Sequence, residues 1–310
     1  MRYAAGTLAL CLCAAVFSAR AEVGETLEKT PAGVHGRNDG GNHEHENDGP
    51  GGQPNGNAGF ATTGNGISYH GGPIMLGTTN VYYIWYGNWT GNNAPTILDN
   101  LITGLSGSPY YNINTTYTNS SGAHVSNSLA LGAQVDDNYS RGKSLSDSAV
   151  FGVVSSALTS GRLPKDPNGV YFVLTSQDVD ETSGFCTQYC GWHTFGSVGG
   201  TPIKFSFVGN AARCLNACAA QSTSPNGNAG ADAMASIVSH ELEEAVTDPQ
   251  LNAWFDSRGF ENADKCAWTF GATSVASNGS RYNMVLNGVQ YLIQRNWVNA
   301  NGGFCALKFP

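Results

Sequence analysis

The chain has 310 residues, with 15 Lys and Arg residues against 23 Asp and Glu residues and a formal net charge of −8. An acidic chain without a cluster of Lys and Arg lacks the electrostatic footprint of a nucleic-acid-binding protein, so we expect no nucleic acid among its partners. Neutral, cationic or metallic partners are expected instead. No segment beyond the N-terminal apolar run reaches the roughly 20 apolar residues that a membrane-spanning helix needs, so we expect no membrane span.

The first 21 residues have the features of a secretory signal peptide. Arg2 supplies a positive charge, the run from Ala4 to Phe17 is apolar, and residues 19–21 (ARA) form a small-x-small cleavage site. An uncleaved membrane anchor is the alternative, but this run is too short to cross a bilayer core of about 30 Å. We therefore expect a secreted mature protein with a net charge of −10, which is extracellular, periplasmic or associated with a cell wall.

Residues 22–66 are predicted to form a disordered leader. They are rich in Gly, Asn, Asp and His and lack apolar periodicity, so they cannot bury enough surface to offset the entropy of ordering the chain. The leader is interpreted as a linker or a pro-segment. Residues 67–310 are long enough to form one globular domain with a substantial core.

Six segments of this domain have the patterns of regular secondary structure. Runs of β-branched and aromatic residues predict strands at Asn80–Tyr86, Gly169–Thr175 and Ile203–Val208. Apolar residues at helical spacing predict helices at Pro95–Leu105, Ser146–Ser160 and Ala231–Thr247. Together they predict a single disulfide-stabilised domain of the α/β or α+β class, in which a mixed sheet packs with about three helices.

Six cysteines remain after removal of the signal peptide, and an even number in an exported chain implies disulfides. They are Cys186, Cys190, Cys214, Cys218, Cys266 and Cys305. Two Cys-x-x-x-Cys pairs are close enough in sequence to close locally, which would leave Cys266 to pair with Cys305. The alternative is a structural zinc held by the four thiolates of the two pairs, but structural zinc sites more often use a two-residue gap.

The predicted helix Ala231–Thr247 contains the segment SHELEEAVTDP. His240 and Glu244 are four residues apart, so both side chains leave one face of the helix about a turn apart. This is the spacing of the two metal ligands in H-E-x-x-H zinc proteases, in which the intervening Glu is the general base. Here Glu241 takes the position of the base and Glu244 that of the second His.

Further ligands are expected downstream, where Glu261 and Asp264 lie three residues apart beside Cys266. Asp248, at the helix end, would ligate the metal or orient His240. We expect one divalent metal, zinc first, with manganese and calcium as alternatives because carboxylates favour harder ions. His193 would be a further ligand, a proton donor or a residue that supports the ligands beside the metal, and a structural histidine in a tight loop is the favoured alternative.

The alternative to a metal site is an ordinary amphipathic helix with solvated surface acids, and Glu243 is expected to be solvated in either case. His240 and Glu244 lie near the edge of the apolar stripe rather than opposite it. Together with the nearby acidic cluster, this position favours a site.

Three stretches in order resemble the EXORDIUM-like, or phosphate-induced protein 1, family of secreted proteins. They are YHGGPIMLGTTNVYYIWYGNW, the paired-cysteine segments FCTQYCGWHTF and RCLNAC, and SHELEEAVTDPQLNAWFD through ENADKCAW. The resemblance implies secretion, a cell-wall or apoplastic location in plants and an association with growth responses, but no established reaction. Its pattern is similar to His-Glu-Leu-x-Glu followed by Glu-x-x-Asp-x-Cys, which His240, Glu241, Glu244, Glu261, Asp264 and Cys266 match.

The leading functional hypothesis is a zincin-like, metal-dependent hydrolase acting on extracellular peptides or proteins. In it, Glu241 accepts a proton from a metal-activated water. The alternative is a non-catalytic extracellular or cell-wall signalling or binding protein in which the same residues hold a structural metal. A third hypothesis is a binder of wall polysaccharides that uses exposed aromatic residues.

Overall fold

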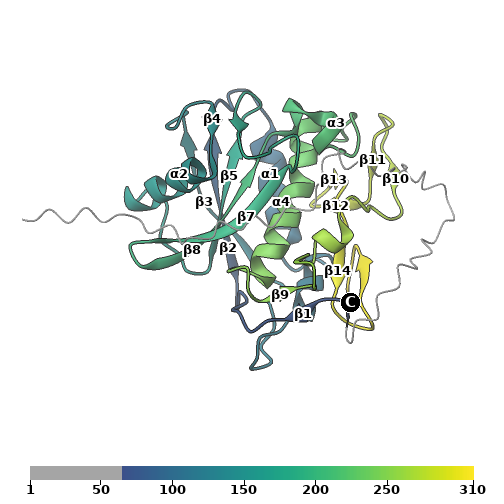
Figure 1. Cartoon of the computed structure of the whole chain (residues 1–310). Helices are drawn as coiled ribbons and strands as arrows, with labels where there is room; N and C mark the ends of the chain where they lie inside the picture. The colour runs from purple at the N-terminus through teal and green to yellow at the C-terminus, as the bar shows by residue number, and fades with distance from the viewer. Residues whose placement is uncertain (1–64) are drawn as a thin grey trace, which may run out of the picture.

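The computed structural model describes residues 65–310, and the predicted signal peptide and nearly all of the predicted leader lie outside the described residues. A five-stranded sheet with the order β3-β2-β5-β8-β7 forms the centre (Figure 1). Its strands are β2 (Thr79–Tyr86), β3 (Leu129–Asp137), β5 (Gly169–Thr175), β7 (Gly191–Val198) and β8 (Thr201–Val208). The pairs β2–β3, β2–β5 and β5–β8 are parallel, whereas the edge strand β7 runs antiparallel to β8. The mixed sheet predicted from the sequence is therefore confirmed.

Three long helices pack on the two faces of this sheet. They are α1 (Ala94–Leu105), α2 (Asp147–Thr159) and α4 (Ala229–Thr247), which agree closely with the three predicted helices. Helix α2 covers one face, and α1 and α4 lie side by side on the other (Figure 1). Helix α4 crosses β7 and β8, so the edge strand and the helix face each other directly.

The two strands that the sequence patterns missed are the two edges of the sheet. In β3 most residues are half-buried, because this strand has one neighbour and a partly open face. Strand β7, with the sequence GWHTFGSV, places polar side chains in the interior, and these polar residues hide its strand pattern. By contrast β5 is buried along its whole length, which explains why its continuous apolar run was readable from sequence.

The segments that follow α4 in the chain cover the side of this helix that faces away from the sheet. They contain short antiparallel strand pairs and a short 3-10 helix, which lie beside α4 in Figure 1. These elements are β10 (Ser274–Val275), β11 (Arg281–Tyr282), β12 (Met284–Leu286), β13 (Val289–Tyr291), β14 (Asn296–Val298), β15 (Phe304–Ala306) and η3 (Asp264–Cys266). As a result, α4 is buried on nearly all sides rather than on one stripe.

The remaining elements are short. They are β1 (Ser68–Tyr69) paired with β9 (Trp254–Phe255), β4 (Ser144–Leu145) paired with β6 (Asp180–Glu181), η1 (Tyr111–Thr116), η2 (Ala211–Arg213) and α3 (Leu215–Cys218).

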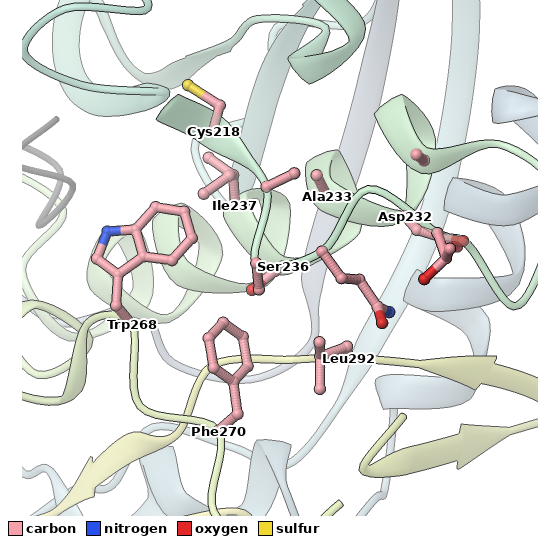
Figure 2. A pocket seen from close by; sticks show the side chains of 13 residues that line it. Cys218, Asp232, Ala233, Ser236, Ile237, Trp268, Phe270 and Leu292 are labelled. Carbon is pink, nitrogen blue, oxygen red and sulfur yellow. The ribbon is translucent and has the colours of Figure 1, made fainter. Parts of the chain in front are cut away.

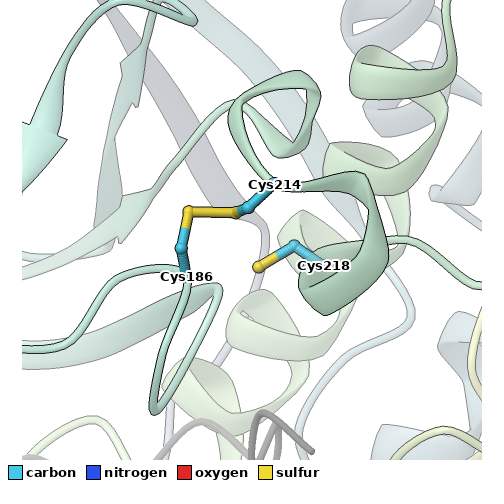
Figure 3. Close-up of side chains that lie close together, drawn as sticks. All are labelled: Cys186, Cys214 and Cys218. Carbon is cyan, nitrogen blue, oxygen red and sulfur yellow. A yellow bond between two sulfur atoms is a disulfide. The ribbon is translucent and has the colours of Figure 1, made fainter.

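Three disulfides are present, and two of them differ from the predicted local pairs. Cys186 pairs with Cys214, and Cys190 pairs with Cys218, so both bonds join the segment before β7 to the segment around α3. Figure 3 shows the first of these bonds beside the sulfur of Cys218. Local closure is unfavourable at α3 because side chains four residues apart on a helix have Cβ atoms about 5–6 Å apart, whereas a disulfide requires about 3.8 Å. The thiolate zinc site is excluded by the same bonds, and the predicted pair Cys266–Cys305 is confirmed.

Candidate metal centre

Helix α4 positions the central residues of the site. Asn228 caps its N-terminus by accepting a hydrogen bond from the backbone N–H of Ala231. The helix then continues without interruption to Thr247, and Pro249 follows its end. His240 and Glu244 therefore lie one turn apart on the same face, as their spacing predicts, with His240 Nε2 3.0 Å from Glu244 Oε1.

Strand β7 brings a second histidine to this face of the helix. His193 stands opposite Ser206 in the β7–β8 register, and its ring is 1% exposed. Its Nε2 lies 2.8 Å from Glu261 Oε2 and 3.6 Å from Glu244 Oε2. The tight loop predicted around His193 is therefore wrong, because His193 lies in strand β7, which packs on α4 and carries this side chain into the acidic cluster.

The segment 261–264 supplies the other two carboxylates. The backbone N–H of Asp264 donates to Glu244 Oε1 at 3.1 Å, and the backbone N–H of Glu261 donates to Asp264 Oδ2 at 3.2 Å. The Asn262 side chain donates to the backbone carbonyl of Glu243, which ties the segment to α4. The Cys266–Cys305 disulfide anchors the chain two residues after Asp264.

Two groups of ligand atoms result, and they share Glu244. In the first, His240 Nε2 is 3.0 Å from Glu244 Oε1 and 3.5 Å from Asp264 Oδ1. In the second, His193 Nε2 faces Glu244 Oε2 and Glu261 Oε2. Within each group all ligand atoms lie within 4.8 Å of one another. Both Glu261 and Asp264 are thus next to Glu244, but only Asp264 is close to His240.

The cluster is buried and short of internal partners. Glu241 and Glu244 are 0% exposed and Glu261 is 1% exposed. Among the ion pairs of residues 65–310, none joins a Lys or Arg side chain to these three carboxylates. Several atoms in the described part of the chain have no hydrogen-bond partner, namely both nitrogens of His240, both carboxylate oxygens of Glu241, Glu244 Oε2, Glu261 Oε1 and His193 Nδ1. Buried carboxylates without a countercharge are costly, so a bound cation fits this donor set.

The pKa shifts follow from this environment. Burial lowers the pKa of His193 to about 4, so its imidazole is neutral at neutral pH and suited to bind a metal. Burial also lowers the pKa of His240, but the carboxylates of Glu244 and Asp264 outweigh it and hold this pKa well above its ordinary value. Burial, followed by the neighbouring carboxylates, raises the pKa of Glu261 well above its ordinary range. A cation bound in the cluster would lower the pKa of Glu261 and favour its ionised form.

Glu241 belongs to neither ligand group. It lies on α4 next to His240, and a side chain at Gly191 of β7 would reach within 3.1 Å of its Oε1 and 2.6 Å of Ile237 Cγ2. The absence of a side chain at Gly191 therefore lets the strand approach the helix beside this carboxylate. Burial raises the pKa of Glu241 well above its ordinary value.

Comparison with known proteins identifies the family of this chain. Residues 67–305 match the conserved region of phosphate-induced protein 1. The chain is 33% identical over 273 residues to Protein EXORDIUM-like 3 of Arabidopsis thaliana, covering 74% of this chain and 80% of that protein. The chain belongs to the phosphate-induced protein 1 family.

Two further members of the phosphate-induced protein 1 family are also similar. Protein EXORDIUM-like 5 of Arabidopsis thaliana is 31% identical over 77% of each chain. Protein PHOSPHATE-INDUCED 1 of Nicotiana tabacum is 28% identical over 64% of this chain and 71% of its own length. A solved structure described as a chaperone–substrate complex covers 55% of this chain and 24% of its own, with a TM-score of 0.28 and 13% identity, which is too low for any structural argument. The family match spans every residue of the buried cluster.

Two acidic residues of this family member lie differently from their sequence predictions. Asp248 makes no hydrogen bond to His240; its Oδ1 accepts from the backbone N–H groups of Asn252 and Ala253, each at 2.6 Å, and it closes the end of α4. Glu243 is 1% exposed instead of solvated, because the C-terminal segments cover the outer side of α4. Asp248 therefore stabilises the chain at the end of α4, and Glu243 lies in the core of the domain.

A pocket lies along an earlier part of α4 and does not contain the cluster. Figure 2 shows Trp268 and Phe270 facing Ser236 and Ile237 of the helix across it. None of the six clustered residues at positions 193, 240, 241, 244, 261 and 264 lines this pocket. Ile237 lines this pocket and also packs against Gly191 of β7, next to the carboxylate of Glu241.

No helix among residues 65–310 combines the length and the apolar character needed to cross a membrane. The three disulfides are typical of proteins in oxidising, extracellular-type compartments.

Proposed function

We propose that this protein is a secreted, metal-dependent hydrolase whose substrates are extracellular peptides or proteins. The metal would bind His240, Glu244 and Asp264, with zinc as the expected ion and manganese or calcium as alternatives. The observation that carries the proposal is Glu241, a fully buried carboxylate that interacts electrostatically with His240, Glu244 and Asp264 without joining either ligand group. Burying an ionised carboxylate costs several kcal/mol, and both oxygens of Glu241, like those of Glu243, lack a hydrogen-bond partner among the described residues.

The residues fit the hydrolysis of an amide bond. A divalent metal at His240, Glu244 and Asp264 would polarise the substrate carbonyl and acidify water. Glu241 accepts a proton as the water oxygen forms a bond to the carbonyl carbon. Glu241 then donates that proton to the amine nitrogen as the carbon–nitrogen bond breaks, which leaves an acid and an amine as products. The reaction consumes one water molecule and needs no oxidant or reductant.

The alternative is a structural metal in a non-catalytic extracellular signalling or cell-wall protein. It is favoured by the burial of the ligands, since His193, His240, Glu244 and Glu261 are at most 2% exposed. A closed structural site needs no access for substrate, whereas hydrolysis requires the segments over the cluster to move. The name of one relative, Protein PHOSPHATE-INDUCED 1, refers to induction by phosphate, which agrees with either role.

The hydrolase and the structural-metal protein predict different results for a variant in which Glu241 is replaced by an uncharged residue. We expect Glu241→Gln to retain its metal and to lower peptide hydrolysis by at least 100-fold, the order of magnitude that general-base catalysis contributes. Glu243→Gln is the matched control, because Glu243 is also buried on α4 but lies beside Tyr110 and Asn114, outside both ligand groups.

The measurement is cleavage of a mixed peptide library by the purified mature protein, with metal content and folding measured on each variant. Loss of cleavage in Glu241→Gln but not in Glu243→Gln supports the hydrolase. Cleavage that persists in Glu241→Gln, or a metal-loaded wild-type protein that cleaves no peptide, would argue for the structural role.

A further inference from the structure

We propose that the cluster holds two divalent metal ions bridged by the carboxylate of Glu244. The first ion lies between His240, Glu244 and Asp264, and the second between His193, Glu244 and Glu261. This inference rests on the proposed function in one respect, namely that the first group binds a metal. It adds a second metal position that the H-E-x-x-E motif does not predict.

The orientation of Glu244 is the main observation. Its Oε1 lies 3.0 Å from Nε2 of His240, whereas its Oε2 lies 3.6 Å from Nε2 of His193. One carboxylate therefore presents a different oxygen to each imidazole. A carboxylate that uses its two oxygens on two ions is a bridging ligand, and such ions stand about 3.5–4 Å apart in two-metal sites.

Each imidazole also has a carboxylate of its own. His240 Nε2 is 3.5 Å from Asp264 Oδ1, and His193 Nε2 is 2.8 Å from Glu261 Oε2. Ligand atoms at about 2.0–2.2 Å from one ion are separated by about 2.9–3.5 Å in octahedral or tetrahedral geometry. The distances of 2.8 to 3.6 Å in the cluster match the spacing of atoms that share an ion.

Unpartnered atoms point to the same conclusion. His240 Nε2 lies close to Glu244 Oε1, yet this pair lacks the geometry of a hydrogen bond. In the second group His193 Nε2 and Glu261 Oε2 form a hydrogen bond, whereas Glu244 Oε2 has no hydrogen-bond partner among the described residues. These side chains are all at least 98% buried. Buried polar atoms without a hydrogen-bond partner are expected where a bound ion completes the site.

Charge also favours two ions over one. Glu241, Glu244, Glu261 and Asp264 carry four negative charges when all are ionised, and neutral imidazoles add none. One divalent ion would leave two negative charges in a buried site, whereas two divalent ions balance all four. The structure offers no Lys or Arg ion pair to Glu241, Glu244 or Glu261 within residues 65–310.

Metal stoichiometry tests the proposal on the mature protein. After saturation with zinc and removal of excess metal, mass spectrometry should find two zinc ions per chain in the wild type. His193→Ala and Glu261→Gln should each retain one ion, and Glu244→Ala should retain none. His124→Ala is the matched control with two ions, because His124 is exposed and lies outside both ligand groups.

A second measurement does not depend on the folding of any variant. With manganese as the probe, electron paramagnetic resonance of the wild-type protein should give the spectrum of a spin-coupled pair, and X-ray absorption of the zinc form should give a metal–metal distance of about 3.5–4 Å. One ion in the wild type, unchanged by His193→Ala, would overturn the two-metal proposal and leave the proposed function intact. No bound metal under any of these conditions would overturn both.

Discussion

Single acidic residues on α4 have different roles because they have different surroundings. Glu241, Glu243 and Glu244 are all buried, although the sequence alone suggested that acids on this helix could be solvated. Spacing correctly places His240 and Glu244 on one face, since a four-residue separation fixes their relative direction on any helix. Spacing could not identify His193, because its distance from His240 depends on how β7 packs against α4.

The carboxyl of Asp248 is buried at the end of α4, and its titration should make the free energy of unfolding depend on pH. Burial is the largest cause that raises its pKa to about 6. An acid whose pKa is higher in the folded than in the unfolded protein stabilises the fold only while it is protonated. The free energy of unfolding should therefore fall as the pH rises from about 4 to about 6, by on the order of 2–3 kcal/mol, and then level off.

Asp248→Asn should remove this contribution while its side-chain oxygen still accepts from the backbone of Asn252 and Ala253. Denaturant unfolding between pH 4 and pH 7 measures the difference. We expect the variant and the wild type to be nearly equal at pH 4 and the variant to be more stable at pH 7. A constant difference across this range would show that Asp248 does not titrate in the window.

At the scale of elements, local patterns predicted the interior of the fold and failed at its edges. The helices α1, α2 and α4 and the strands β2, β5 and β8 have continuous or periodic apolar residues, and all six were predictable. The edge strands β3 and β7 were not, because an edge strand has one neighbour and tolerates polar residues and Gly. Since β7 carries His193, one of the three residues of the second ligand group was hidden with it.

The disulfides Cys186–Cys214 and Cys190–Cys218 fix the segment before β7 relative to the segment around α3. Each of them closes a loop of 28 residues, and both join the same two segments. The chain-entropy model assigns roughly 3–4 kcal/mol to the first closure and about 2–3 kcal/mol to the second, because the first bond already brings the segments together.

Removal of both disulfides should therefore destabilise the protein more than the sum of the two single removals. We expect roughly 2–3 kcal/mol for Cys186→Ala/Cys214→Ala or for Cys190→Ala/Cys218→Ala alone, and roughly 6 kcal/mol for all four substitutions. Urea unfolding of the three variants gives these values. Strictly additive losses would mean that the two bonds constrain independent parts of the chain.

At the scale of the whole molecule, the cluster joins segments that are distant in sequence. Strand β7, helix α4 and the segment 261–264 meet at Glu244, and the C-terminal strand pairs cover the outer side of the helix. The sequence predicts the family and the class of fold, but it cannot predict this enclosure, which depends on how short C-terminal elements pack. Enclosure turns a surface-like acidic motif into a buried set of possible ligands, and a bound cation would offset the cost of ionised carboxylates there.

The central claim is that this buried cluster is a metal centre, and anomalous X-ray diffraction at the zinc edge tests it most directly. Crystals of the mature protein grown with zinc should give a strong anomalous peak within about 2.0–2.2 Å of His240 Nε2 and of oxygens of Glu244 and Asp264. The two-metal arrangement predicts a second peak between His193, Glu244 and Glu261. An ordered cluster without any anomalous peak, in crystals whose solvent contains zinc, would contradict the account.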